Sequence, residues 1–154
     1  MNDNHPITEE QFSHIVRNSP LVSIDLIITD PSGCALVGLR NNEPAKGTYF
    51  VPGGVIRKGE AIKEAFNRIL RTETGYEASI GLAHFAGVFE HFYPTNRFNN
   101  PGYGTHYVVL AYRLGVNRRP EIRLDDQHSE SKWMSAADIL AAPDVHENTK
   151  AYFR

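Results

Sequence analysis

A glycine-rich turn and a single carboxylate mark the stretch of this sequence that could carry chemistry. Gly53 and Gly54 follow a proline, and a glycine lets the backbone approach a ligand closely. The helical pattern after them places five apolar residues on one face: Ile62, Ala65, Phe66, Ile69 and Leu70. Glu73 falls on that same face, where an apolar side chain is expected. Because burying an unpaired carboxylate costs several kcal/mol, Glu73 must have a cationic partner or lie at the solvated end of the helix.

The spacing of the whole segment resembles the Nudix box, whose pattern is Gly-x5-Glu-x7-Arg-Glu-apolar-x-Glu-Glu-x-Gly-apolar. The positions that match it are Gly54, Glu60, Arg68, Leu70, Glu73 and Gly75. Two carboxylates of the pattern are missing, because Ile69 and Thr72 stand where Glu is usual, and Tyr76 replaces the closing aliphatic residue. The resemblance implies the α/β Nudix fold, in which a mixed β-sheet lies between helices.

Composition narrows the class of protein. The chain has 154 residues and a mass of 17.3 kDa, which suits one domain over residues 1–154. Its formal net charge is -2, with acidic and basic residues interspersed, so we expect no nucleic-acid partner. Cys34 alone cannot form an intrachain disulfide, which fits a reducing compartment. The sequence shows no signal-peptide pattern and no apolar run long enough to cross a membrane, so we expect a cytoplasmic protein.

Periodicity and turn residues predict the elements before the box. Thr8 and a Gln three residues later predict a capped helix through about Arg17. Residues 21–29 read as a strand with Ile24 on one face and Asp25 on the other. A turn at residues 30–33 then leads into a hairpin partner that ends at Arg40.

The second half of the chain reads as further strands and short helices. Residues 84–93 and 107–116 have strand character, and a long loop of residues 94–104 joins them. We expect that loop to lie over the site or at an interface. Residues 125–130 read as a polar loop, Ser135 caps a short helix, and Asp144 caps a terminal helix that ends near Phe153.

The depleted box favours one kind of hydrolysis. Nudix proteins mostly hydrolyse a nucleoside diphosphate linked to another moiety, and attack on phosphorus generally relies on several box carboxylates that gather several Mg²⁺ ions. With one inward carboxylate, fewer metal ions should bind. One Mg²⁺ suits a reaction in which the diphosphate leaves while water attacks an anomeric sugar carbon. His128 is the candidate base for that water, although it could be an ordinary exposed loop residue.

A closer resemblance covers nearly the whole chain. The matching segments are 8–28, 38–40, 49–54, the depleted box, 91–93, 105–110, 126–128 and 144–153, and together they resemble the GDP-mannose mannosyl hydrolase branch of the Nudix family. That branch cleaves the carbon–oxygen bond of a GDP-hexose with inversion and yields GDP and free sugar. The resemblance implies GDP-mannose as the first substrate, with GDP-glucose also open, and a homodimer.

The same resemblance implies roles for matching residues. One Mg²⁺ per subunit, for which Mn²⁺ would substitute, would be held by the main-chain oxygen of Gly53, Glu73 and Gln127. His128 would be the general base assisted by Asp25, and Arg40 would bind the diphosphate. Arg68 would do likewise, or pair with Glu64 one helical turn away. The implied substrate contacts are Pro6, Ile7, Phe12, Arg40, His91 and Tyr107.

Two other functions remain open from the sequence. An ordinary Nudix pyrophosphohydrolase would attack phosphorus and release a nucleoside monophosphate, and Ile69 and Thr72 argue against it. A non-catalytic Nudix module would bind a nucleotide sugar without turnover. The joint presence of Glu73, Gln127 and His128 argues against that second alternative.

Overall fold

The computed structural model describes residues 7–122 and 128–154, with the backbone alone for His128 and Ser129. Its strands are β1 (Leu21–Thr29), β2 (Ala35–Arg40), β3 (Tyr49–Phe50), β4 (Gly53–Val55), β5 (His84–Tyr93), β6 (Thr105–Gly115) and β7 (His128–Met134). Its α-helices are α1 (Glu9–Asn18), α2 (Ile62–Thr74), α3 (Ala136–Ala141) and α4 (Glu147–Lys150), and η1 (Ile80–Leu82) and η2 (Ala151–Phe153) are short 3₁₀ helices.

The strands form one mixed sheet, as the sequence predicts. Its order is β3-β2-β1-β6-β5, with β4 paired to β1 and β7 paired to β2. Strand β1 runs parallel to β6 and antiparallel to both β2 and β4. Asp25, in the middle of β1, therefore lies between Gly53 on β4 and Ala111 on β6.

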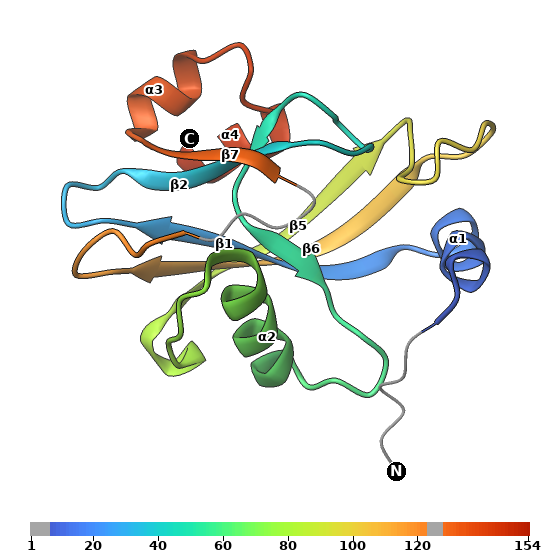
Figure 1. Ribbon diagram of the computed structural model, residues 1–154, viewed down its shortest axis with the longest axis horizontal. Coiled ribbons are helices and arrows are strands. Elements are labelled where there is room, and N and C mark those ends of the chain that lie inside the picture. The colour runs from blue at the N-terminus through green and yellow to red at the C-terminus, as the bar shows by residue number, and fades with distance from the viewer. Residues whose placement is uncertain (1–6, 123–127) are drawn as a thin grey trace.

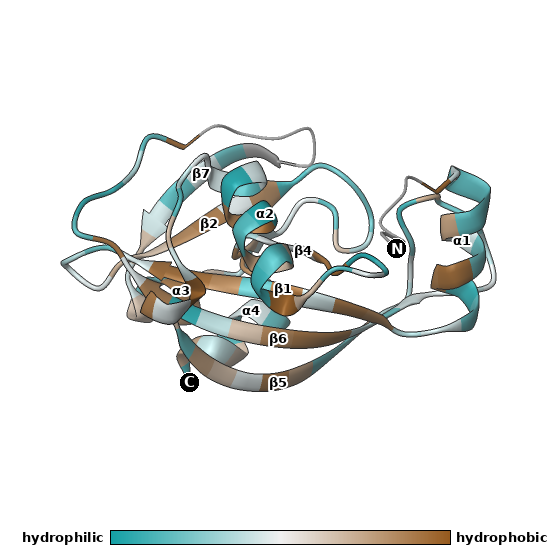
Figure 2. Ribbon diagram, turned by 90° about the horizontal axis from the view of Figure 1, so that it is seen from below, coloured by the Kyte–Doolittle hydropathy of each residue, from teal (hydrophilic) through white to brown (hydrophobic). Residues whose placement is uncertain are grey.

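Helices cover both faces of the sheet (Figure 1). Alternate residues of β1 supply two cores, because side chains along a strand point to opposite faces. Ile24 packs with α2 through Phe66 and Ile69, whereas Ile27 packs on the other face with α3 and η2. Figure 2 shows α2 lying over the sheet with its apolar side toward the strands. Asp25 thus faces α4 and η2, as its position in β1 predicts. None of the helices in the described part of the chain is long and apolar enough to span a membrane.

Helix α1 lies at one end of the sheet, against the loop of residues 94–104. Its N-cap is the predicted one, since the Thr8 hydroxyl accepts a hydrogen bond from the Gln11 amide. Phe12 meets Phe98 edge to face with ring centroids 5.7 Å apart. The Ser13 and Tyr103 hydroxyls lie 2.6 Å apart. The loop therefore packs on α1.

Helix α2 ends at the glycine of the box, Gly75. Gly75 has a φ of 75°, the left-handed conformation that a glycine adopts readily at a helix C-terminus. Ile62 is 44% exposed, so the buried face of α2 begins at Ala65.

An ion pair fastens the segment between β4 and α2 onto the helix. Arg68 donates from Nε to Glu60 Oε2 at 2.7 Å and from Nη2 to the Val55 carbonyl, also at 2.7 Å. Glu60 also accepts from the Arg57 amide, and the hydrogen bond from Arg68 lowers the pKa of Glu60. The Glu64 pairing offered as an alternative for Arg68 is wrong, because Glu64 caps the helix at the Ala61 amide.

Three other local predictions are wrong. Gly53 and Gly54 belong to strand β4 and not to a turn. His128 begins strand β7, so the polar loop ends before it. The terminal helix is capped by His146, whose Nδ1 accepts from the Asn148 amide at 3.0 Å, and not by Asp144. In each case pairing with a distant segment or the cap geometry decided between local alternatives.

We expect Arg68→Ala to lower the free energy of unfolding by about 1–3 kcal/mol, because it leaves the largely buried Glu60 carboxylate and the Val55 carbonyl without their donor. Urea unfolding monitored by circular dichroism would measure the change. Arg71→Ala is the matched control on the same helix, since its side chain is 64% exposed and its contact with Glu77 is 3.9 Å long. Equal losses in the two variants would contradict the structural role of Arg68.

Candidate active site

The backbone of β4 approaches β1 so closely that only glycine fits at position 53. A Cβ on Gly53 would collide with the Asp25 carboxylate and would come within 2.8 Å of the Ile24 carbonyl oxygen. The main chain of Gly53 therefore lies directly beside a carboxylate of the central strand. This contact brings the glycine pair and Asp25 into one site.

Ile69, at a box position where a carboxylate is usual, packs against the second glycine. A Cβ on Gly54 would lie 3.0 Å from the Ile69 side chain, and Ile69 is 1% exposed. Ile69 thus fills the space between β4 and α2 with hydrocarbon. Thr72 is exposed, and Glu73 lies one turn beyond Ile69 in a partly buried position. Of the three carboxylate positions of the box, this helix retains one, at its C-terminal end.

A hydrogen-bonded group lies on the face of the sheet opposite α2. Tyr152 donates its hydroxyl proton to Asp25 Oδ2 at 2.6 Å, and the same hydroxyl lies 3.4 Å from His91 Nε2. Burial raises the pKa of Asp25 to about 6, although the hydrogen bond from Tyr152 and the charge of Arg40 oppose the shift. Burial, with a smaller effect of His146, lowers the pKa of His91 to about 4. His91 is therefore a neutral imidazole near pH 7.

Arg40 brings a positive charge to this group. Its guanidinium lies 5.5 Å from the centroid of the Phe50 ring, and its charge acts on Asp25 and Tyr107. Arg40 Nε is buried and has no hydrogen-bond partner within the described part of the chain. An unpaired buried donor on a cation is costly, so this atom is suited to an anionic ligand.

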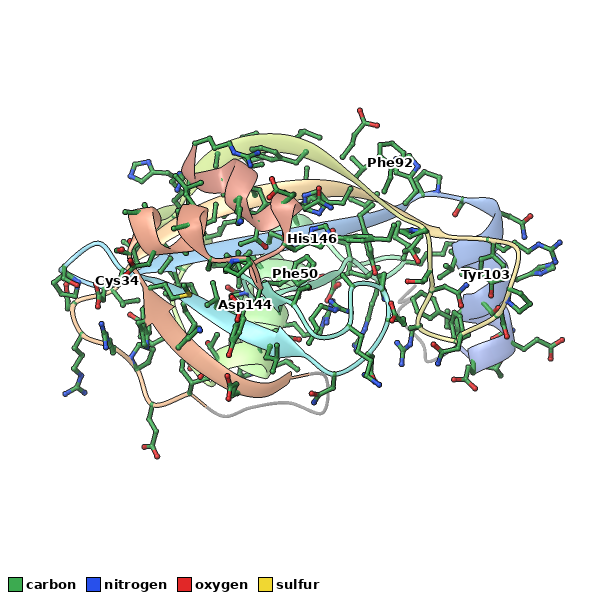
Figure 3. All side chains as sticks on the ribbon, turned by 90° about the horizontal axis from the view of Figure 1, so that it is seen from above. Cys34, Phe50, Phe92, Tyr103, Asp144 and His146 are labelled. Carbon is green, nitrogen blue, oxygen red and sulfur yellow. The ribbon has the colours of Figure 1, made fainter. Side chains whose placement is uncertain are left out.

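Several aromatic rings lie near Arg40 and contact one another. His146 stacks on Phe50 with ring centroids 5.0 Å apart and lies 5.3 Å from the ring of Tyr93. His146 and Phe50 are labelled in Figure 3. Tyr93 in turn meets Tyr107 at 5.9 Å. Burial raises the pKa of both tyrosines, so their hydroxyls stay neutral and can act as hydrogen-bond donors.

The oxygen donors at this site suit a hard divalent cation. Among the side chains that the structure describes, in residues 7–122 and 130–154, no group of three or more His, Cys, Asp or Glu could hold a metal. The predicted ligands within the described residues are instead one main-chain oxygen, that of Gly53, and one carboxylate, that of Glu73. That donor set fits Mg²⁺, which prefers oxygen ligands and commonly takes one or two carboxylates together with phosphate oxygens. The third predicted ligand, Gln127, lies outside the described residues.

The structure brings most of the other predicted residues together. The charge of Arg40 acts on Asp25 and Tyr107, and the Tyr152 hydroxyl lies between Asp25 and His91. The backbone of His128 pairs with Arg40 in the β2–β7 ladder. Arg68 does not join them, because its guanidinium is bound to Glu60 and Val55. Phe12 packs on Phe98, Ile7 is exposed, and Pro6 lies outside the described residues.

Sequence reasoning missed the residues that the C-terminal segment supplies. His146, the N-cap of α4, stacks on Phe50 of β3. Tyr152 of η2 reaches Asp25 on β1 and His91 on β5. Tyr152 looks like a core residue in the sequence, and its ring is indeed in the core. A phenol at a buried position is a usable signal, because its hydroxyl must find a partner.

Comparisons with known proteins identify the family. The NUDIX domain model matches residues 19–154, so the chain belongs to the Nudix hydrolase family, whose members act on nucleotide-linked substrates and typically use a divalent metal ion. The low-salt glycan biosynthesis protein Agl8 of Haloferax volcanii is 37% identical over 126 residues, covering 82% of this chain and 78% of that protein.

Two further matches agree with this assignment. An ADP-ribose pyrophosphatase of Methanocaldococcus jannaschii is 39% identical over 56 residues, covering 36% of this chain and 32% of that protein. The crystal structure of a MutT protein from Methanosarcina mazei has the same fold, with a TM-score of 0.70 and 20% identity over 88% of this chain and 92% of that one.

We expect His91→Gln to weaken the pH dependence of the free energy of unfolding between about pH 4 and pH 6.5. His91 titrates at about 4 in the native state and its ordinary pKa is 6.5, so the unfolded state binds more protons between those values. Native stability that is present above pH 6.5 is therefore lost as the pH falls toward 4, by up to about 1.4 kcal/mol per pH unit.

Urea unfolding in metal-free buffer at several pH values across that window would measure the slope. His84→Gln is the control, because His84 is exposed and should keep the slope of the parent protein. An unchanged slope in His91→Gln would contradict a buried neutral imidazole.

Proposed function

We propose that this protein hydrolyses a GDP-hexose, with GDP-mannose as the first substrate and GDP-glucose as the second, to GDP and the free sugar. Water would attack the anomeric carbon of the sugar with inversion. The observation that carries this proposal is Ile69 packed against Gly54 at a box position where a carboxylate is usual. A helix with one remaining carboxylate is poorly equipped to gather the several metal ions that attack on phosphorus generally requires.

The divalent ion would neutralise the diphosphate as it leaves. We propose one Mg²⁺ per subunit, with Mn²⁺ as a substitute, held by the Gly53 carbonyl, Glu73 and Gln127. Arg40 would bind the same diphosphate, since its buried Nε has no partner within the described residues and its guanidinium is fixed over Phe50. The site would thus stabilise negative charge that develops as the carbon–oxygen bond breaks.

His128 would remove the proton from the attacking water. Its backbone pairs with Arg40 in the β2–β7 ladder, which supports a place near the phosphate-binding end of the site. Asp25, on which the charge of Arg40 acts, would orient the sugar or the water. In this step the water oxygen would bond to the anomeric carbon, and the electron pair of the broken carbon–oxygen bond would leave with the diphosphate oxygen. His128 would take the proton of the water.

Neutral donors around Asp25 suit a sugar. His91 and Tyr107 lie opposite each other on β5 and β6, and both are uncharged near pH 7 because burial disfavours their charged forms. Hydroxyl groups of a hexose both donate and accept hydrogen bonds, so a carboxylate beside neutral donors complements them. The name of the Haloferax volcanii relative, a glycan biosynthesis protein, also supports a sugar-linked substrate.

We also propose a homodimer in which the segment containing Pro6, Ile7 and Phe12 meets the second subunit. Two isoleucines near the N-terminus, Ile7 and Ile15, are more than 40% exposed, which supports a contact at that end of the molecule.

The alternative function is pyrophosphohydrolysis by attack on phosphorus. The match to an ADP-ribose pyrophosphatase over 56 residues supports it. A pyrophosphohydrolase would release a nucleoside monophosphate and a sugar phosphate. A non-catalytic binding module, the second alternative, would release no product.

Hydrolysis of GDP-mannose with Mg²⁺ in water enriched in heavy oxygen tests these functions. We expect the label in free mannose and none in GDP, because water attacks carbon. Mass spectrometry of both products would measure it, and repeating the assay with GDP-glucose would rank the two sugars. Label in a phosphate product would establish attack on phosphorus instead, and tight binding without product would indicate the binding module.

We expect His128→Gln to lower kcat by roughly 10²–10⁴, the usual contribution of a general base, with the fold intact. Steady-state kinetics near neutral pH would measure the loss, and circular dichroism would report the fold. His106→Gln is a control histidine variant on the sheet face away from Asp25, where its ring stacks on Phe92. A loss below tenfold in His128→Gln would remove His128 from the role of base.

A further inference from the structure

We propose that Tyr152 is a positioning residue of this active site, whose hydroxyl fixes Asp25 on β1 and His91 on β5 in one arrangement. The proposal rests on the proposed function, because it assigns Tyr152 to the two side chains that would contact the sugar. It adds the C-terminal 3₁₀ helix to the parts of the chain that the reaction depends on.

The hydrogen-bond geometry defines the direction of each contact. A phenol has one proton, and Tyr152 donates it to Asp25 Oδ2 at 2.6 Å. The same oxygen lies 3.4 Å from His91 Nε2, so it can accept only if that nitrogen carries a proton. One hydroxyl therefore contacts both side chains and favours the His91 tautomer that carries its proton on Nε2.

The arrangement of the strands explains why a third residue is needed. Asp25 pairs with Ala111 on β6, and His91 pairs with Tyr107 on the same strand, four positions away. Asp25 and His91 are thus on strands that do not adjoin each other. Ala111 is small and fully buried in the same core cluster as Tyr152, which leaves room for the phenol above the sheet.

Packing of the ring and a hydrogen bond to the backbone hold Tyr152 in place. Its side chain is 2% exposed, and its ring meets Phe89 edge to face at 4.8 Å. Its carbonyl oxygen accepts a hydrogen bond from Arg113 on β6. Because packing sets the place of the ring, the hydroxyl is a fixed point from which Asp25 can be oriented.

Loss of that fixed point should affect the reaction more than binding. An Asp25 carboxylate released from Tyr152 can rotate away from the geometry that the reacting sugar requires, while Arg40 still holds the diphosphate. The Tyr152→Phe variant removes the hydroxyl and keeps the ring against Phe89. Tyr112→Phe is the matched control, since Tyr112 packs against Phe66 on the other face of the sheet.

The test compares the two variants with the parent protein on GDP-mannose. We expect Tyr152→Phe to lower kcat by roughly 10-fold to 100-fold, the effect of losing one hydrogen bond to a charged group, with KM changed less than about threefold. Tyr112→Phe should keep the parent kcat and melting temperature, whereas Tyr152→Phe should melt somewhat lower, because the buried Asp25 loses a hydrogen-bond donor. A kcat within twofold of the parent, or a loss confined to KM, would overturn the positioning role.

A second measurement separates this proposal from the proposed function. Nitrogen NMR of the imidazoles reports the tautomer of His91 whether or not GDP-mannose is a substrate. If the parent protein is inactive, the proposed function fails, yet a shift of the His91 Nε2 resonance in Tyr152→Phe would still support the contact. An unchanged His91 spectrum would overturn the contact. If Tyr152→Phe proved too unstable for kinetics, its spectrum would be recorded at low temperature and read in the same way.

Discussion

Two close approaches of one short strand, β4, decide what this site can contain. Gly53 lies against the Asp25 carboxylate and Gly54 lies against Ile69, and neither contact leaves room for a Cβ without a shift. The Arg68–Glu60 pair and the Val55 carbonyl hold the segment that follows β4 onto α2. The backbone of β4 is consequently fixed between the central strand and the box helix. Any oxygen that it presents to a ligand is placed by those packing contacts, with little dependence on a flexible loop.

The site around Asp25 contains groups whose charged forms are disfavoured by burial and one cation with an unpaired donor. Burial disfavours ionisation of Asp25 and protonation of His91, so each group keeps its neutral form over a wider pH range than it does in water. Arg40 remains a cation with a buried donor that has no partner in the described residues. Besides the Asp25 carboxyl group, the site has one cation with an unpaired donor, neutral phenols and a neutral imidazole, and this combination suits an anion attached to a polar group. A nucleoside diphosphate sugar has both parts in one molecule.

Membership of the Nudix hydrolase family and the character of this box are separate facts. Ile69 keeps the packing between α2 and β4 while removing a carboxylate that could bind metal. Ile69 adds an apolar contact to the core at this position, and the position carries no charge. Activity must therefore be argued from the residues of the site, since one fold carries several reactions.

Periodicity in the sequence determined the strands β1 and β5, the helices α1 and α2, and the face of β1 on which Asp25 lies, because these depend on neighbours within a few residues. Motif spacing likewise located Gly53, Gly54 and Glu73. Only the tertiary structure decided that Arg68 binds Glu60, that His146 caps α4, and that β7 begins at His128 opposite Arg40. It alone joined Tyr152 to Asp25, which precedes it by 127 positions. Local patterns carry no record of such a contact, because the partner is chosen by how the C-terminal segment packs on the finished sheet.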